Sequence, residues 1–427
     1  MTGKLDRFDS APWYFAHIPK SGGTTFSVLF DRLFDVKEIF PHQLLWEVGH
    51  ISPERSHQYK LFRGHFNALG CHLAYRQTRN VTILRNPVDM AFSSYKHICN
   101  DPNTNLHQQV VGENWSFEDF IFSPESKNVV SNKMTRFLQL GAGVPLGDVH
   151  YELNEDTFRR FRRQFKLKKG RPNIEEKFEL ALNYLKGCFW VGVLDELPES
   201  LDLLCYQLSL PPINEIPVLN KGTSDMQLSA VAIQHLNEMN FYDLKLLSWA
   251  KENLKSKCSK LDAQTGSRTE IMESSYQQNH CRIFHKQPQH EVQLSMDQPL
   301  IGDQWLQRQF DRKTQSYYRW SGPGNKAFID LWLVRKSFAV EILILDHCLT
   351  RWDDLSIDAN HNSIPYTITP TGDGWCLSAR LCEQLIASDG LLRLTFNIQQ
   401  GALDKTQHNS NINQIKPSLA LKHVILR

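Results

Sequence analysis

Short apolar runs alternate with helical patterns along the first part of the chain. Residues 13–18 form an aromatic and β-branched run short enough for a buried strand, and apolar side chains then recur at helical spacing from Phe26 to Leu33. Residues 81–84 and 188–194 are two further buried-strand patterns, each followed by a helical pattern. This alternation predicts an α/β fold.

The pattern changes toward the C-terminus. Residues 255–299 are rich in Gln, Ser, His and Lys without sustained periodicity, which is typical of a polar linker. Beyond it, short alternating or apolar runs separated by Gly, Pro, Asn and Asp predict an antiparallel β-sandwich or jelly roll. These runs are residues 317–320, 327–333, 338–345, 355–359, 391–398 and 420–426. We therefore expect an α/β domain over residues 1–255, a linker over 256–298 and an all-β sandwich domain over 299–427.

The turn between the first strand and its helix reads Pro-Lys-Ser-Gly-Gly-Thr-Thr over residues 19–25. Its two glycines let the backbone approach a ligand, and the first amides of the helix point toward that ligand with the positive end of the helix dipole. Lys20 adds a positive charge, while Thr24 and Thr25 add hydroxyl donors that also suit a helix cap. The turn thus predicts a phosphate-binding loop. Lys20 precedes the glycines, whereas the P-loop of nucleotide triphosphatases places its lysine after them.

A second phosphate-binding pattern follows the strand over residues 81–84. Arg85 stands at the exit of the strand, Pro87 suits the first turn of a helix, and Ser93 follows further along that helix. A guanidinium and a hydroxyl at one helix entrance suit a phosphate monoester, which arginine binds through two parallel hydrogen bonds.

The two patterns together resemble those of sulfotransferases that use 3′-phosphoadenosine-5′-phosphosulfate, particularly carbohydrate sulfotransferases. Residues 19–25 are similar to the 5′-phosphosulfate loop of this family, and residues 85–95 to its 3′-phosphate element R-[DN]-P-x-x-R-x-x-S-x-Y. Met90 departs from the pattern, because the family often has a second arginine there. The resemblance covers roughly residues 10–255 and implies a three-layer, P-loop-like fold with a parallel sheet. The implied donor ligands are Lys20, Ser21, Gly22, Gly23, Thr24 and Thr25 on the 5′ side and Arg85 and Ser93 at the 3′-phosphate.

The general base is the next functional residue that the resemblance implies. A short strand pattern ends at Phe62, so His65 lies near the edge where open α/β sheets bind ligands. Its surroundings, Gly-His-Phe, resemble the element that supplies the general base in some glycan-modifying members, although a structural histidine would show the same pattern. If another residue is the base, Glu38 and then His42 are the next candidates.

Three further features have an ordinary structural explanation as well as a functional one. Asn132 and Arg136 lie in a stretch similar to an N-x-x-T-R-F-L helix that lines the donor cleft in related enzymes, but any amphipathic helix fits them equally. Residues 158–171 are densely basic, which suits either an anionic glycan or a solvated face. Tryptophans of the C-terminal part are either stacking platforms for sugars or core residues; they are Trp305, Trp320 and Trp375.

The composition is that of an ordinary globular protein. The formal net charge is +2 over 427 residues, and no motif supports nucleic-acid binding. Nine cysteines are scattered without metal-ligand spacing, which favours a reducing compartment and argues against a zinc site. We find no signal peptide and no apolar run long enough to span a bilayer, so we expect a cytoplasmic, bacterial protein.

These patterns lead to the hypothesis that the protein transfers a sulfuryl group from 3′-phosphoadenosine-5′-phosphosulfate to a hydroxyl of a carbohydrate acceptor. Lys20 and His65 are the expected catalytic residues: Lys20 stabilises charge on the donor, and His65 takes the acceptor proton. No metal is expected, because fixed cations and helix amides would do what magnesium does in kinases. Two alternatives remain open, a P-loop-type kinase and a non-catalytic glycan-binding protein.

Overall fold

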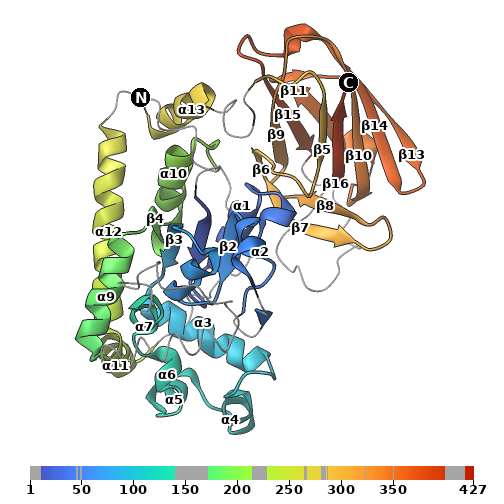
Figure 1. The fold of residues 1–427 in the computed structure, drawn as a ribbon. Coiled ribbons are helices and arrows are strands. Elements are labelled where there is room, and N and C mark those ends of the chain that lie inside the picture. The colour runs from blue at the N-terminus through green and yellow to red at the C-terminus, as the bar shows by residue number, and fades with distance from the viewer. Residues whose placement is uncertain are drawn as a thin grey trace.

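The fold has two regions, a parallel sheet with helices and an antiparallel all-β region (Figure 1). Both are seen in a computed structural model. It describes residues 11–44, 47–48, 51–139, 172–213, 228–263, 267–279, 285, 287–322, 324–349, 351–399 and 419–427. A mixed α/β region followed by an all-β region agrees with the sequence prediction.

The parallel sheet contains four short strands in the order β2-β1-β3-β4. Their bounds are β1 (Trp13–Ala16), β2 (Leu61–Gly64), β3 (Arg79–Leu84) and β4 (Trp190–Val193). β1 and β4 are buried along their whole length, as expected for strands covered on both faces. From β1 the chain crosses to one side for β2 and later to the other side for β3. The strand order therefore reverses between β1 and β3, and such a point is where open α/β sheets bind ligands, at the carboxyl ends of the strands.

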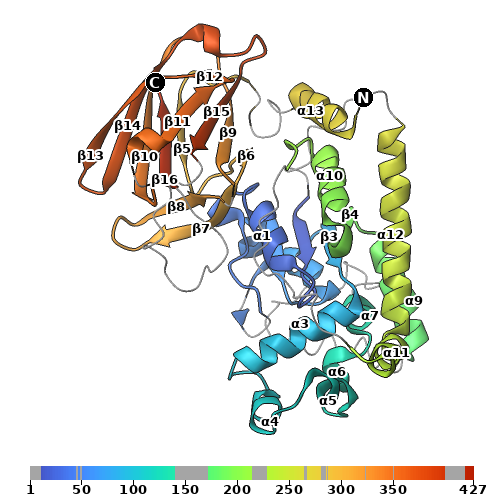
Figure 2. The same cartoon turned by 180° about the vertical axis from the view of Figure 1, so that it is seen from behind.

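Helices pack against this sheet. Helix α1 (Gly23–Asp31) follows β1, and α3 (Pro87–Asn100) follows β3, with Pro87 at its start as predicted. α10 (Leu197–Leu208) and α12 (Phe241–Asp262) contact β4 (Figure 2). No helix among the described residues is long and apolar enough to cross a membrane. The remaining helices of this region are η1 (Val36–Glu38), α2 (Pro53–His57), η3 (Ala68–Ala74), α4 (His107–Gly112), α5 (Phe117–Phe122), α6 (Lys127–Val130), α7 (Lys133–Leu138), α9 (Ile174–Lys186), η6 (Leu194–Glu196) and α11 (Ala230–Met239).

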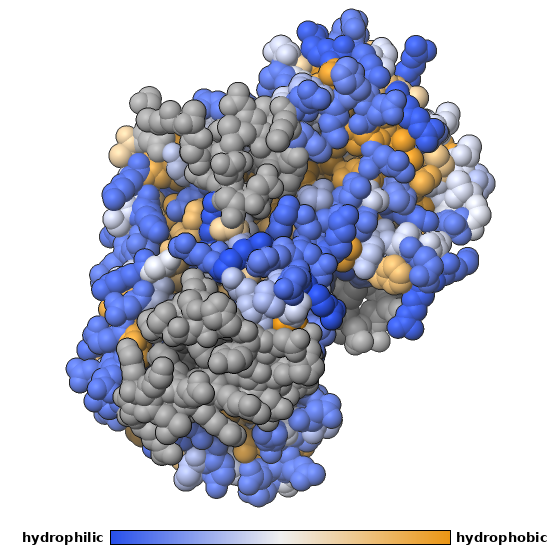
Figure 3. All heavy atoms as spheres, viewed as in Figure 1, coloured by the Kyte–Doolittle hydropathy of each residue, from blue (hydrophilic) through white to orange (hydrophobic). Residues whose placement is uncertain are grey.

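The all-β region consists of two antiparallel sheets around one apolar core. The larger sheet has the order β13-β14-β10-β16-β8-β7, with β5 also paired to β16, and the smaller has the order β12-β11-β15-β9-β6. On the face shown in Figure 3, hydrophobic residues gather over this region, whereas the visible surface of the other region is mostly hydrophilic. The strands are β5 (Val292–Ser295), β6 (Gly302–Asp303), β7 (Trp305–Asp311), β8 (Ser316–Ser321), β9 (Lys326–Trp332), β10 (Phe338–His347), β11 (Leu355–Ala359), β12 (Asn362–Ser363), β13 (Tyr366–Thr371), β14 (Gly374–Leu381), β15 (Leu391–Ile398) and β16 (Leu419–Leu426); two short helices, η8 (Trp352–Asp354) and η9 (Glu383–Leu385), connect them.

The predicted linker over residues 256–298 needs correction. Helix α12 continues to Asp262, a further helix α13 (Arg268–Asn279) follows, and β5 already belongs to the larger sheet. α13 contacts both α10 and α12. The sequence concealed this helix because only a few of its side chains are buried, among them Met272 and Tyr276, so its polar composition dominates the pattern.

Candidate anion-binding site

The turn after β1 is shaped by close contacts. Gly22 has φ 81°, and a Cβ atom there would lie 2.6 Å from the side chain of Leu194. A Cβ atom at Gly23 would lie 2.0 Å from the ring of His17. The hydroxyl of Ser21 donates to the carbonyl of Ile18 (2.7 Å), which closes the turn. Both glycines are thus required for steric reasons, and donor binding through the Ser21 hydroxyl stays a prediction.

The backbone of this turn presents positive charge to its ligand side. Lys20 has φ 72°, a left-handed conformation that costs a residue with a side chain about 1–2 kcal/mol. The first amides of α1 have no carbonyl partner within the helix, and its first turn holds no acidic residue. The side chains of Thr24 and Thr25 lie outside the described residues. These features suit an anion at the N-terminal end of α1.

Arg85 joins the two turns at the point where the strand order reverses. It follows β3, and its Nη1 donates to the carbonyl of Lys20 over 3.0 Å. Burial lowers the pKa of the Arg85 guanidinium, while the charges of Asp89 and Asp195 raise it. Ser93 is half-buried on α3, and its hydroxyl makes no hydrogen bond with another described residue. Of the sequence-predicted pair, Arg85 contacts the first turn, and a role of Ser93 in phosphate binding stays a prediction.

Lys133 is a site residue that the sequence reasoning missed. It begins α7, and its Nζ donates to the hydroxyl of Ser94 on α3 over 3.3 Å. Burial and the charges of Lys20 and Arg136 together lower the pKa of Lys133 to about 8, and Asp243 opposes this shift. A lysine at the start of an amphipathic helix usually lies in solvent, so the sequence carried no signal for this placement.

Lys20, Arg85 and Lys133 form a cation cluster at the carboxyl edge of the sheet. Burial and the neighbouring charge of Arg85 both lower the pKa of Lys20, which shows that the cluster is mutually repulsive. The charges of Lys20 and Lys133 also lower the pKa of His97 on α3. Half-buried like charges are unfavourable unless an anion compensates them. Among the described residues, no group of three or more His, Cys, Asp or Glu side chains could hold a metal ion.

His65 lies directly after β2, next to this cluster. Its Nδ1 is 2.7 Å from the carbonyl oxygen of His17. Because a carbonyl can only accept a hydrogen bond, Nδ1 carries the proton and Nε2 carries a free electron pair. Burial lowers the pKa of His65, the hydrogen bond to His17 opposes this, and the charges of Lys133 and Lys20 lower it further. The ring is therefore neutral near pH 7 and able to accept a proton at Nε2.

His17 supports this arrangement. Its ring centroid lies 4.3 Å from that of His65 and 5.3 Å from that of Phe15. Burial, together with the charges of His65, Arg63 and Lys20, lowers the pKa of His17 to about 3. A neutral His17 ring packs against Gly23 and so connects the loop with His65.

Asn132 and Arg136 hold helices together. The Asn132 Oδ1 accepts hydrogen bonds from the amides of Tyr242 (3.0 Å) and Asp243 (3.1 Å) at the start of α12. The Arg136 guanidinium donates to the carbonyl oxygens of Asn128 (2.5 Å) and Asn132 (3.4 Å). Both side chains are engaged in packing α7, and a role in donor binding stays a prediction.

Glu38 is excluded as an alternative base at this site. It forms an ion pair with Lys60 (2.9 Å), and Lys60 directly precedes β2. Lys60 and His65 are five positions apart along extended chain, a span of roughly 16 Å. Glu38 thus lies at the opposite edge of the sheet. His42 remains an alternative, because the carbonyl of the next residue, Gln43, accepts a hydrogen bond from the amide of His65 (2.8 Å).

The other predicted features lie apart from the cluster. The basic segment 158–171 lies outside the described residues. Trp305 is buried and donates to the carbonyl of Phe328 (2.8 Å), which makes it a core residue. Trp320 is half-buried in β8, and Trp375 packs against Trp352 with 5.7 Å between ring centroids. A sugar-stacking role for these two tryptophans stays a prediction.

Comparisons with known proteins found little. No family model matches the chain, and no curated protein matches it. A family 35 carbohydrate-binding module from Clostridium thermocellum is 12% identical, covers 32% of this chain and 98% of its own, and has a TM-score of 0.21. A family GH115 4-O-methyl-α-glucuronidase with specificity for decorated arabinogalactans is 9% identical, covers 97% of this chain and 51% of its own, and has a TM-score of 0.19. TM-scores this low support no conclusion about this protein.

Proposed function

We propose that the protein transfers a sulfuryl group from 3′-phosphoadenosine-5′-phosphosulfate to a hydroxyl of a carbohydrate acceptor. The observation that carries this proposal is the cation cluster of Lys20, Arg85 and Lys133 beside a neutral His65. A doubly phosphorylated, sulfated nucleotide would supply the negative charge that the cluster lacks.

The two turns suggest how the donor would be divided between them. The 5′-phosphosulfate would lie over the first amides of α1 and the Lys20 side chain, as in a P-loop-like fold. The 3′-phosphate would lie against Arg85 and Ser93. One contact supports this division of the donor between the two turns. Arg85 donates to the Lys20 carbonyl, and this hydrogen bond fixes the distance between the turns.

The chemistry then needs few protein groups. The acceptor oxygen forms a bond to sulfur while the bond between sulfur and the bridging oxygen of the 5′-phosphate breaks, and the electron pair leaves with that oxygen. Lys20 and the loop amides stabilise the charge that develops on the leaving phosphate. His65 Nε2 takes the proton of the acceptor hydroxyl, a role typically worth roughly 10²–10⁴-fold in rate.

A transfer assay tests this function. Donor labelled in its sulfur atom is incubated with a panel of oligosaccharides, and label is followed in the separated sugars. We expect labelled sugar with the native protein and almost none with Lys20→Ala. Transfer of the terminal phosphate of ATP in the same assay would instead support a kinase. Sugar binding without transfer from either donor would support a non-catalytic glycan-binding protein.

A further inference from the structure

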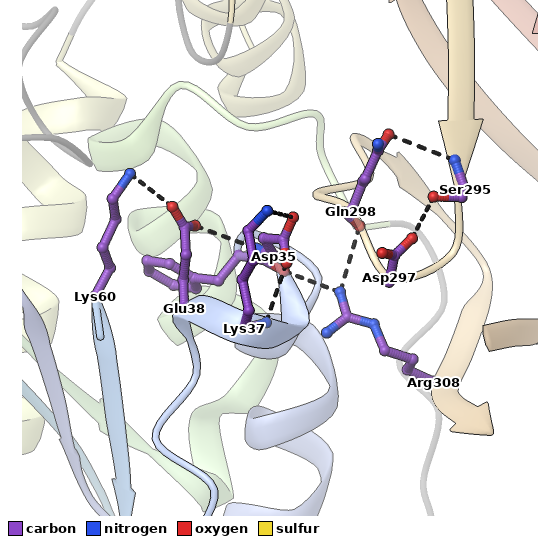
Figure 4. A network of polar contacts seen from close by, with 9 residues as sticks. Asp35, Lys37, Glu38, Lys60, Ser295, Asp297, Gln298 and Arg308 are labelled. Carbon is purple, nitrogen blue, oxygen red and sulfur yellow. Dashed lines mark hydrogen bonds and ion pairs between the residues drawn. The ribbon is translucent and has the colours of Figure 1, made fainter. Parts of the chain in front are cut away.

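The all-β region forms hydrogen bonds with the chain immediately after α1. Arg308 of β7 donates to the carbonyl of Phe34 over 2.9 Å, and also to the carbonyls of Met296 (2.8 Å) and Gln298 (3.3 Å). The amide of Val36 donates to the carbonyl of Asp297 (2.8 Å). Figure 4 shows Arg308 and the turn over residues 295–298 on one side and the η1 residues on the other.

Two more arginines are buried in the same interface. Arg32, the residue after α1, donates to the carbonyl of Gly302 (3.2 Å), and its own carbonyl accepts from Leu300 (2.8 Å). Arg319 of β8 is fully buried; its Nη1 donates to Leu306 (3.2 Å), while its Nε and Nη2 have no hydrogen-bond partner among the described residues. Burial lowers the pKa of Arg319 far below its usual value, the charges of Arg308 and Arg32 add to this, and Asp31 opposes it.

Arg32 directly follows the C-terminal end of α1, and Arg308 of β7, a strand that contacts α1, binds the chain three residues beyond that end. The carbonyls at that end carry partial negative charge, and nearby cations stabilise them. The last turn of α1 contains no basic residue of its own. Its final residue, Asp31, accepts two hydrogen bonds from Arg63 of β2 (2.6 and 2.8 Å), and its charge also acts on Arg308 and Arg319.

The N-terminal end of α1 therefore adjoins the anion-binding loop, residues 19–25, and its C-terminal end adjoins the interface with the all-β region. A helix of nine residues is about 13 Å long, so a tilt of about 5° at one end moves the other by about 1 Å. Misplacements of about 1 Å matter at sites where reacting groups must be aligned. Arg63 lies two residues before His65, so the interface also borders the strand that carries the predicted base.

We propose that the β-sandwich is a positioning element for the anion-binding loop: Arg308 fixes the chain at the C-terminal end of α1 and thereby the orientation of residues 19–25, while Arg319 supports β7, the strand that carries Arg308. This role is independent of which anion the loop binds. It also means that the all-β region is part of the working site and not a separable appendage.

Hydrogen exchange on the full chain tests this proposal. Exchange is followed by mass spectrometry in a peptide spanning residues 17–31 for the native protein, Arg308→Met, Arg308→Lys and Arg319→Met. We expect Arg308→Met to exchange about threefold to tenfold faster in this peptide, and Arg308→Lys to lie between it and the native protein. Arg319→Met removes a buried cation with unmet hydrogen bonds, so we expect it to fold while also loosening the peptide.

Two control variants separate positioning from general loosening. Arg427→Met removes an exposed arginine of the sandwich whose Nη1 lies 4.0 Å from Glu341. Tyr366→Phe removes the hydrogen bond to the carbonyl of Leu355 (2.5 Å) from β13, which lies at the opposite end of the larger sheet from β7. We expect neither to change exchange in residues 17–31. Unchanged exchange in both Arg308→Met and Arg319→Met, or an equal increase in Tyr366→Phe, would overturn the proposal. The readout needs no ligand, so a failure of donor binding would contradict the proposed function separately.

Discussion

At the scale of single residues, Lys20 and His65 are expected to act on different partners. Lys20 would contact the donor both in the bound state and in the transition state, so Lys20→Ala should weaken donor binding and slow turnover together. His65 would contact the acceptor hydroxyl alone, so His65→Ala should leave donor affinity unchanged while turnover falls by about 10²–10⁴-fold. Donor titration and turnover on the same proteins measure this split.

His107 offers a matched control for that experiment. Its Nδ1 also lies 2.7 Å from a backbone carbonyl, that of Ile98, but it begins α4, away from β2. His107→Ala should therefore keep full turnover. If His65→Ala keeps it as well, the assignment of the base fails and His42 is the next residue to test.

We expect Lys133 to make the binding of an anionic donor depend on pH. Its pKa is about 8, so its positive charge is present below that pH and is lost as the pH rises through it. We expect the affinity for adenosine 3′,5′-bisphosphate to fall above about pH 8, whereas Lys133→Arg should keep its affinity at alkaline pH because arginine stays charged. Calorimetric titrations between pH 7 and 9 measure the difference, and identical profiles for the two proteins would remove Lys133 from the site.

The sequence predicted the residues that form local patterns. Lys20 and Arg85 could be found because each lies between a strand and the helix that follows it within a few residues. Lys133 could not, because its place beside Lys20 depends on how α7 packs against α3. Glu38 was misplaced for the same reason: its position along the chain does not reveal at which edge of the sheet it lies.

At the scale of elements, the turn into α1 depends on the absence of a side chain at Gly23. An added methyl group would overlap the His17 ring, so Gly23→Ala should lower the free energy of unfolding by about 1–3 kcal/mol and weaken donor binding. A methyl group added at Gly112, at the end of α4, would meet no other atom within 4 Å, so Gly112→Ala should be neutral or slightly stabilising. Urea unfolding compares the two variants, and equal stabilities would contradict the steric account.

The strands show why some elements were predictable. The runs over residues 81–84 and 355–359 appear as β3 and β11 because continuous or alternating apolar residues mark buried strands. α13 and β5 were missed because each buries few side chains. In addition, β5 pairs with β16, which is distant in sequence. Local pattern predicts an element only where that element buries a continuous face.

At the scale of the whole molecule, the polar linker predicted two domains without contacts between them, but the two regions of the structure contact each other. Arg32 and Arg308 hydrogen-bond across the interface, and α13 contacts both α10 and, through Tyr276, β9. Composition cannot reveal such an interface, because its arginines look like surface residues in the sequence.

If Arg85 and Ser93 bind a 3′-phosphate, adenosine 3′,5′-bisphosphate should bind more tightly than 5′-AMP, and calorimetric titration compares the two nucleotides. Charge-assisted hydrogen bonds contribute about 1.5–3 kcal/mol, so we expect the native protein to prefer the bisphosphate at least about tenfold. Arg85→Ala should abolish that preference, while a control variant of the exposed helix α2, Arg55→Ala, should keep it. Equal affinity of the native protein for the two nucleotides would contradict the account.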